Sequence, residues 1–291
     1  MGAPSWQSLS VAELEREYTP SSMVASLAAE LRVYAAASAR TQAAHPPIEL
    51  RYGPGPGELL DLYLPDRPTD RPTGRPAAQV PLLAFVHGGY WQELGKHDAA
   101  FPAAPVLARG AAYASIGYPL APAASLAQIV DAVRRAVAWL HRHAPEHGID
   151  PARIQLAGSS AGAHLAAEVL LHGRVPLRAL TLLSGVYDLR PLVPTTVNHA
   201  LGLTAEQAWE LSPIRRVRQA GPPVLVAWGE IETAQFVAQS RAFAAALAAA
   251  GTPVQTWELA GLNHFDNVFA LTDPATPVGA ATLSVLEEIP R

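Results

Sequence analysis

Apolar runs of strand length alternate with helical patterns along most of the chain. The apolar runs cover residues 80–86, 111–117, 153–157, 177–183, 223–228 and 254–259. Amphipathic segments lie between them, such as residues 125–143, where apolar side chains recur at helical spacing until Pro145 interrupts the pattern. Short buried strands that alternate with helices are typical of a mainly parallel, twisted sheet with helices on both faces. The pattern therefore predicts one α/β domain over residues 1–291.

The first forty residues are predicted to form an N-terminal helical segment rather than part of the sheet. Ser10 and Glu13 have the spacing of a capping box, which predicts a helix start. In residues 22–40, one helical face carries four apolar or aromatic side chains, namely Met23, Leu27, Leu31 and Tyr34. We therefore expect two helices within residues 8–40 that pack on the main domain.

Three further segments do not fit the regular alternation. Residues 59–64 alternate as a strand does and predict an early, partly exposed strand. Residues 65–81 are rich in proline, which removes backbone donors and blocks helix formation, so we expect a surface loop. Residues 186–222 combine several prolines with a broken pattern, and we expect this insertion to cover the active site as a lid.

Charge and composition narrow the classes of function. The 291 residues include 21 basic and 25 acidic side chains without a long run of either sign, which argues against nucleic-acid binding and favours a small-molecule substrate. The chain has no cysteine, which excludes disulfides and thiolate metal sites and leaves a cytoplasmic location as the expectation. No stretch is apolar enough to suggest a membrane span. The sequence leaves open whether the chain forms a homodimer.

The strongest chemical signal is the motif Gly158-Ser159-Ser160-Ala161-Gly162. It follows an apolar run and opens a helical pattern, so Ser160 is predicted to lie on a sharp turn between a strand and a helix. Small residues at both ends of Gly-x-Ser-x-Gly allow this turn and expose the central side chain. Ser160 is therefore the candidate nucleophile of a serine hydrolase.

A serine nucleophile needs a histidine base and a carboxylate that orients it. In this arrangement the acid and then the histidine follow the serine along the chain. His264 comes after the last strand-like run and is in the right place for the base. The strand-like run 223–228 ends in residues 229–232, which contain Glu230 and Glu232, and we expect the acid to come from this loop.

The segment His87-Gly88-Gly89-Tyr90-Trp91 follows another apolar run. Its place at the end of a central strand is where open α/β sheets bind ligands. Successive glycines let backbone N–H groups face a developing oxyanion, so Gly88 and Gly89 are predicted to form an oxyanion hole with the N–H of Ala161. We interpret His87 as a structural residue that makes hydrogen bonds.

Several motifs together resemble the kynurenine formamidase (arylformamidase) family, a branch of the α/β-hydrolase fold. The motifs are HGGYWQ at 87–92, GSSAGAHLA at 158–166, SGVYDLRPL at 184–192, GEIETAQF at 229–236 and NHFD at 263–266. The resemblance covers about residues 45–270 and preserves the order of the motifs. It implies hydrolysis of an N-formyl arylamine, such as N-formylkynurenine, without a cofactor.

The resemblance also implies roles for individual residues. Ser160 is then the nucleophile, His264 the base, and Glu232 stands where the family's acid, often an aspartate, is placed. Glu230 and Asp188 remain alternatives for the acid. Because the leaving group is aromatic, we expect an aromatic wall in the pocket, with Tyr90 and Trp91 as candidates for substrate binding.

Three other functions are weighed against formamide hydrolysis. A carboxylesterase that acts on short-chain or aryl esters would use the same triad and is the main alternative. A binding protein on a hydrolase scaffold should lack a member of the triad, and this chain lacks none. Metal-dependent hydrolysis is suggested only by His141, His143 and His147, and Pro145 interrupts the helix that would align them. We therefore expect no metal site.

Overall fold

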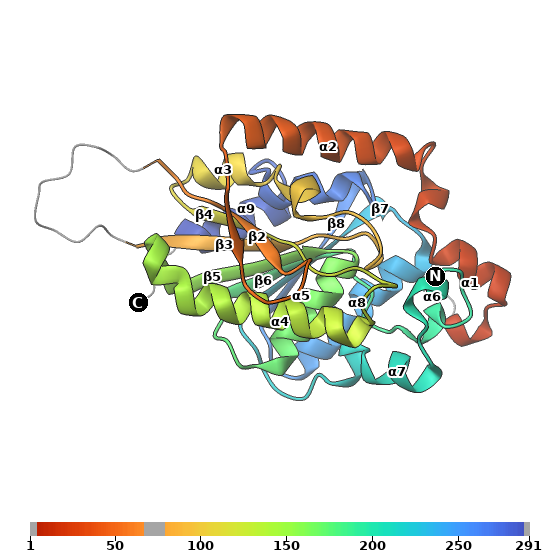
Figure 1. Ribbon diagram of the computed structural model, residues 1–291. Helices are drawn as coiled ribbons and strands as arrows, with labels where there is room; N and C mark the ends of the chain where they lie inside the picture. The colour runs from red at the N-terminus through yellow and green to blue at the C-terminus, as the bar shows by residue number, and fades with distance from the viewer. Residues whose placement is uncertain (1–4, 67–78, 288–291) are drawn as a thin grey trace, which may run out of the picture.

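An eight-stranded mixed sheet forms the centre of the computed structural model, which describes residues 5–66 and 79–287 (Figure 1). The strand order is β1-β2-β4-β3-β5-β6-β7-β8, and only the pairs β1–β2 and β2–β4 are antiparallel. The strands are β1 (Ile48–Arg51), β2 (Leu59–Tyr63), β3 (Val80–Val86), β4 (Ala112–Ile116), β5 (Ile149–Ser159), β6 (Ala179–Leu183), β7 (Val224–Ile231) and β8 (Val254–Asn263).

Two apolar cores cover the two faces of the sheet. Alternate residues of β3 point to opposite faces, so Leu82 belongs to one core and Leu83 to the other. The first core is closed by α4 (Leu126–His143), α5 (Ala161–His172) and α8 (Ala234–Ala249), and the second by α3 (Ala103–Leu107) and α9 (Pro277–Glu287) (Figure 1). This arrangement confirms the predicted α/β class with helices on both faces.

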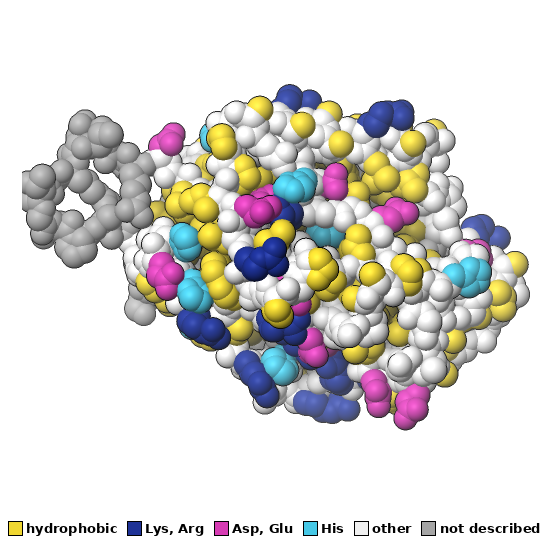
Figure 2. All heavy atoms as spheres, in the orientation of Figure 1, with side chains coloured by type: hydrophobic (Ala, Val, Ile, Leu, Met, Phe, Trp, Pro, Cys, Tyr) yellow, Lys and Arg dark blue, Asp and Glu magenta, His cyan; other side chains and the backbone are white. Residues whose placement is uncertain are grey.

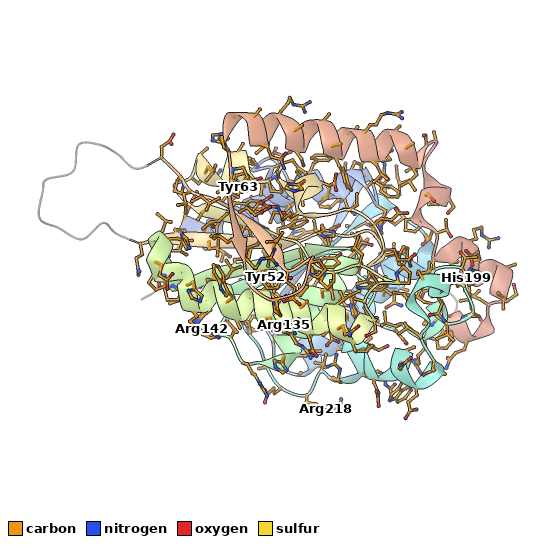
Figure 3. All side chains as sticks on the ribbon, viewed as in Figure 1. Tyr52, Tyr63, Arg135, Arg142, His199 and Arg218 are labelled. Carbon is orange, nitrogen blue, oxygen red and sulfur yellow. The ribbon has the colours of Figure 1, made fainter. Side chains whose placement is uncertain are left out.

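The six apolar runs correspond to β3 through β8, but the sequence analysis missed β1 and misjudged β2. Residues 60–63 of β2 are buried, so the expectation of a partly exposed strand is wrong. The cause is β1, which pairs along β2 and makes it an interior strand of the sheet. Figure 3 shows Tyr52 and Arg135 near this edge, where the Tyr52 hydroxyl donates to the carbonyl of Gly117 at 2.7 Å.

The N-terminal helical segment is confirmed, with a break that the pattern did not predict. It contains α1 (Val11–Glu17), whose Ser10 cap is a complete capping box, a short 3₁₀ turn at Pro20–Met23, and α2 (Leu27–Ala44). Residues 22–26 are not part of α2, because the side chain of Ser26 caps the helix by accepting from the N–H of Ala29.

Helix α2 spans one side of the molecule (Figure 1), and its described contacts with the body include several polar ones. The Tyr34 hydroxyl donates to the carbonyl of Phe265 at 2.5 Å, and the Ser38 hydroxyl donates to the carbonyl of Asp98 at 2.8 Å. Only Ser38 and Thr41 of this helix are buried. Hydrogen bonds, more than a continuous apolar face, therefore hold α2 in place.

Residues 186–222 form short helices next to the N-terminal segment. They include α6 (Asn198–Leu201) and α7 (Ala205–Glu210), and the N–H of Thr196 donates to Glu15 of α1 at 2.8 Å. Residues 67–78 of the expected proline-rich loop lie outside the described residues. Within the part of the chain that the structure describes, no helix is both long and apolar enough to cross a membrane.

Candidate active site

Ser160 lies at the sharp turn between β5 and α5. Its φ of +55° is a left-handed conformation that is uncommon for a residue with a side chain, and its N–H donates to the carbonyl of Leu183 on β6 at 2.8 Å. A Cβ atom on Gly162 would lie 2.0 Å from the carbonyl oxygen of Val86, so only glycine fits there. The turn that exposes Ser160 therefore depends on this close approach to β3.

Three side chains that are distant in sequence form one hydrogen-bonded chain. The Nε2 atom of His264 is 3.0 Å from the Oγ atom of Ser160, and its Nδ1 atom is 2.9 Å from Oε2 of Glu232. Ser160, Glu232 and His264 are 7%, 8% and 5% exposed, respectively. The strands β5, β7 and β8 bring these side chains together at their carboxyl ends, in the arrangement of a Ser-His-acid triad.

The second carboxylate oxygen of Glu232 is held by neutral donors. Oε1 accepts from the N–H of Gly229 at 2.6 Å, from the Nδ2 atom of Asn267 at 2.9 Å and from the Ser184 hydroxyl. Burial raises the pKa of the Glu232 carboxyl, but the electrostatic interaction and hydrogen bond with His264, together with the other donors, outweigh this effect and hold the pKa below its ordinary value. Glu232 is therefore an ionised carboxylate directed at His264.

The two alternative acids have other partners. Asp188 forms a bidentate ion pair with Arg190, with nitrogen to oxygen distances of 2.8 and 2.6 Å. Glu230 is exposed and accepts from the N–H of Gly261 at 2.7 Å. The structure brings neither of them into hydrogen-bond contact with His264.

The backbone of the His87-Gly88-Gly89 segment lies against Ser160. A Cβ atom on Gly88 would be 3.3 Å from the Cβ atom of Ser160, so glycine permits the close approach. Within residues 5–66 and 79–287, the N–H groups of Gly88 and Gly89 have no hydrogen-bond acceptor. Ala161 begins α5, and the first N–H groups of a helix have no partner inside the helix. Unpaired donors are thus available on both sides of the nucleophile.

His87 supports this segment and does not contact Ser160 through any described hydrogen bond. Its ring stacks on Tyr118 with centroids 4.1 Å apart, and its Nδ1–H donates to the carbonyl of Gly88 at 2.8 Å. Burial lowers the pKa of His87 to about 4, so the ring is neutral near neutral pH. The Tyr118 hydroxyl also donates to the carbonyls of His87 and Gly88. These contacts fix the loop that carries the free N–H groups.

A cavity of about 320 Å³ opens onto Ser160 and His264. Its lining includes residues from the N-terminal segment, among them Tyr18, Leu27, Leu31 and Tyr34. From residues 186–222 it includes only Thr196 and Val197. The N-terminal segment therefore contributes more of the described covering of the pocket than the insertion does.

The predicted aromatic wall needs a correction. Tyr90 lines the cavity, and its hydroxyl donates to the carbonyl of Tyr18 at 2.6 Å. The assignment of Trp91 to substrate binding is wrong, because its indole is fully buried beside His164. Both residues have positive φ angles, 48° and 61°, and this tight turn directs the Trp91 side chain into the core.

Other aromatic side chains that line the cavity were missed by the sequence analysis. They are Tyr18, Tyr34, Phe85, Phe101 and Phe265. Tyr34 was assigned to the packing face of a helix, and that face is directed at the cavity. Phe265 follows His264 directly, which was an available signal, whereas nothing in the sequence around Phe101 indicated its position.

The described lining of the cavity includes two acidic residues but no lysine or arginine. Glu93 and Asp98 are part of it, no described Lys or Arg is, and neither carboxylate belongs to an ion pair within residues 5–66 and 79–287. In Figure 2, acidic and histidine side chains prevail in the area below α2, and Lys and Arg gather mainly toward the lower edge.

The histidines that suggested a metal do not form a site. His143 pairs with Glu146, its Nδ1 lying 2.9 Å from Oε1, and stacks on Trp139. In the described parts of the chain, no group of three or more His, Cys, Asp or Glu side chains is placed to hold a metal ion.

Comparison with known proteins finds relatives among the hydrolases. Kynurenine formamidase of Danio rerio is 33% identical over 287 residues, which cover 92% of this chain and 94% of that protein. Esterase LipQ of Mycobacterium tuberculosis is 33% identical over 243 residues, which cover 74% of this chain and 56% of that protein. A family profile described as BD-FAE matches residues 60–175.

A solved structure supports the fold over the whole chain. The crystal structure of a protein from Silicibacter sp. TM1040 superposes with a TM-score of 0.79 at 27% identity. The superposition covers 95% of this chain and 99% of that one. The similarity in sequence and in structure thus extends over nearly the full length of the chain.

Proposed function

The chain belongs to the kynurenine formamidase family of α/β-hydrolases, and on this premise we propose that it cleaves the formamide bond of an N-formyl arylamine such as N-formylkynurenine. The observation that carries this proposal is the hydrogen-bonded chain from Ser160 through His264 to Glu232 at the base of a cavity lined by aromatic side chains. The products are formate and the free arylamine.

In the first half of the reaction, Ser160 forms a covalent bond with the formyl carbon. His264 Nε2 takes the hydroxyl proton as Oγ attacks, and the free N–H groups of Gly88, Gly89 and Ala161 stabilise the oxyanion. The carbon to nitrogen bond then breaks, and His264 returns the proton to the departing aniline nitrogen. Glu232 stabilises the imidazolium that exists between these two proton transfers.

In the second half, water replaces the amine. His264 takes a proton from the water as its oxygen attacks the formyl ester on Ser160, and the same N–H groups stabilise the second oxyanion. The proton returns to Ser160 Oγ as the ester bond breaks, and formic acid leaves and ionises to formate in water. Every proton moves between the substrate, water, Ser160 and His264, so the reaction needs no further reactant.

Steady-state kinetics on N-formylkynurenine test the proposal. We expect release of kynurenine with saturation kinetics, and loss of that activity in Ser160→Ala. A fluorophosphonate probe should label the unaltered protein at Ser160. A rate on N-formylkynurenine that stays at the uncatalysed level, in protein that the probe labels, would refute formamide hydrolysis.

Ester hydrolysis is the second candidate, favoured by the similarity to Esterase LipQ. The same side chains cleave both bond types, so fold alone does not choose between them. The kcat/KM values for N-formylkynurenine and p-nitrophenyl acetate distinguish the two functions. Fast ester cleavage with formamide cleavage near the uncatalysed rate would identify a carboxylesterase instead.

A further inference from the structure

We infer that Ser184 and Asn267 are positioning residues that enable a glutamate to act as the acid of the triad. The inference rests on the proposed function, because it assigns Glu232 to the active site. It concerns residues that do not touch the nucleophile and to which the sequence analysis assigned no role in the reaction. We call Ser184, Asn267 and the N–H of Gly229 the carboxylate clamp.

The carboxylate clamp joins three segments around one oxygen atom. Ser184 follows β6, Gly229 lies in β7, and Asn267 lies in the 3₁₀ helix Asp266–Thr272, just after His264. Asn267 Nδ2 donates to Ser184 Oγ at 2.7 Å and to Glu232 Oε1 at 2.9 Å, and Ser184 donates to the same Oε1 atom. Oε1 therefore has a full set of donors, which leaves Oε2 for His264.

Both side chains of the carboxylate clamp are fully buried, which makes their hydrogen bonds consequential. Ser184 and Asn267 are each 0% exposed. Ser184 has a φ of +47°, an unfavourable conformation that persists only where neighbouring contacts enforce it. Its N–H is held by the carbonyl of Ala227 at 2.9 Å. The fold thus accepts a backbone cost at the residue that holds the acid.

The length of glutamate explains why a clamp is needed. Compared with aspartate, Glu232 has one more rotatable bond, so fixing its side chain costs more conformational entropy. Burial further disfavours its charged form, whereas hydrogen bonds to the charged form favour it. The carboxylate clamp supplies both effects, because it restricts the rotation of Glu232 and stabilises its charge.

A double-mutant cycle tests this inference. Ser184→Ala, Asn267→Leu and Asn267→Ser are made in the unaltered protein and again in Glu232→Ala. In the unaltered protein, we expect each change to lower kcat about 10- to 100-fold with KM within about twofold, because a misoriented acid impairs proton transfer and not binding. The acid limb of the kcat/KM profile should also move, because the donors of the clamp hold down the pKa of Glu232. In Glu232→Ala, the same changes should cost less than about twofold.

Thr282→Ala is the matched control. Thr282 is also 0% exposed and donates to or accepts from Thr181 at 3.0 Å, so its removal costs a buried hydrogen bond away from the pocket. It should lower the melting temperature without moving the pH profile. Equal losses of kcat in both backgrounds, or a loss confined to KM, would overturn the inference. If Ser184→Ala does not fold, the two Asn267 variants decide.

Fluorophosphonate labelling separates this inference from the proposed function. The labelling rate reports activation of Ser160 without a formamide substrate. We expect it to fall about 10-fold or more in Asn267→Leu and to fall no further when Glu232→Ala is already present. If labelling follows this pattern but N-formylkynurenine is not cleaved, the carboxylate clamp stands and formamide hydrolysis fails. Labelling that is unchanged in Asn267→Leu would refute the carboxylate clamp.

Discussion

The floor and the roof of the cavity are built in different ways. The floor, formed by Ser160, Glu232 and His264, lies at the ends of central strands, and each of these side chains is at most 8% exposed. The roof, formed by residues 18–34, is attached by hydrogen bonds and by aromatic contacts of Tyr18 and Tyr34, and its Leu27 is 36% exposed. The floor is therefore fixed by the packing of the sheet, and the roof by a smaller set of polar and aromatic contacts.

This difference separates chemistry from substrate choice. A side chain whose rotamer is fixed by burial and by hydrogen bonds can hold catalytic geometry. The roof lines the cavity and makes no described hydrogen bond to Ser160, Glu232 or His264. Changes there should therefore alter binding more than the chemical step. Variants of the floor should thus lower kcat, and variants of the roof should raise KM.

The largest effect is expected at the nucleophile. Ser160→Ala removes the atom that bonds to the formyl carbon, and kcat should fall by about 10⁴- to 10⁶-fold with little change in the melting temperature. Kinetics on N-formylkynurenine and thermal unfolding measure the two quantities. Ser284→Ala, the same change on the exposed face of α9, should be silent. A Ser160→Ala protein that keeps more than a tenth of the activity of the unaltered protein would contradict the assignment of the chemical step to the floor.

A second prediction compares the candidate acids. Glu232→Gln keeps the shape of the side chain but removes its charge, and kcat should fall by about 10³-fold or more. Asp188→Asn weakens an ion pair with Arg190 and should keep kcat within about threefold. Glu230→Gln, two positions from Glu232, is the matched control and should resemble the unaltered protein. Activity lost in Asp188→Asn but kept in Glu232→Gln would reassign the acid.

The floor could be predicted from the sequence because its signals are local. The Gly-x-Ser-x-Gly turn requires small residues at fixed positions, and the order of Ser160, the acid loop and His264 follows from the order of the strands. The partners of Glu232 could not be predicted in this way. Ser184 and Asn267 meet only after three strand ends converge, and nothing in their neighbouring residues indicates this.

The position of the roof could not be predicted because the spacing of its side chains does not distinguish a cavity lining from a packed core. Leu27, Leu31 and Tyr34 have the spacing of a packing face, and a face that lines a cavity has the same periodicity. Trp91 was misassigned because a turn with positive φ reverses the direction that proximity to Tyr90 suggested. The direction in which the folded backbone points a side chain, rather than the residue type, decides here whether the residue lies in the core or in the pocket.

A third prediction addresses the attachment of the roof. Tyr34→Phe removes the hydrogen bond to the carbonyl of Phe265 but keeps the ring that lines the cavity. A hydrogen bond of about 1 kcal/mol corresponds to roughly fivefold, so KM for N-formylkynurenine should rise by about that factor while kcat changes less than twofold. Tyr63→Phe, outside the cavity lining, is the control. A lower kcat with an unchanged KM would mean that Tyr34 acts on the chemical step, as the residues of the floor do.

The smallest expected effect concerns charge at the cavity. Glu93 and Asp98 belong to the described lining, which has no lysine or arginine, so an anionic arylformamide should bind less well than a neutral one. Asp98→Asn should raise kcat/KM for N-formylanthranilate about two- to threefold and leave the value for formanilide unchanged, because partly exposed charges interact weakly. The gain should shrink at high ionic strength, because salt screens the charge of Asp98 in the unaltered protein. Asp131→Asn, an exposed change on α4, should affect neither substrate. An equal gain for both substrates would mean that Asp98 acts through the shape of the cavity rather than through its charge.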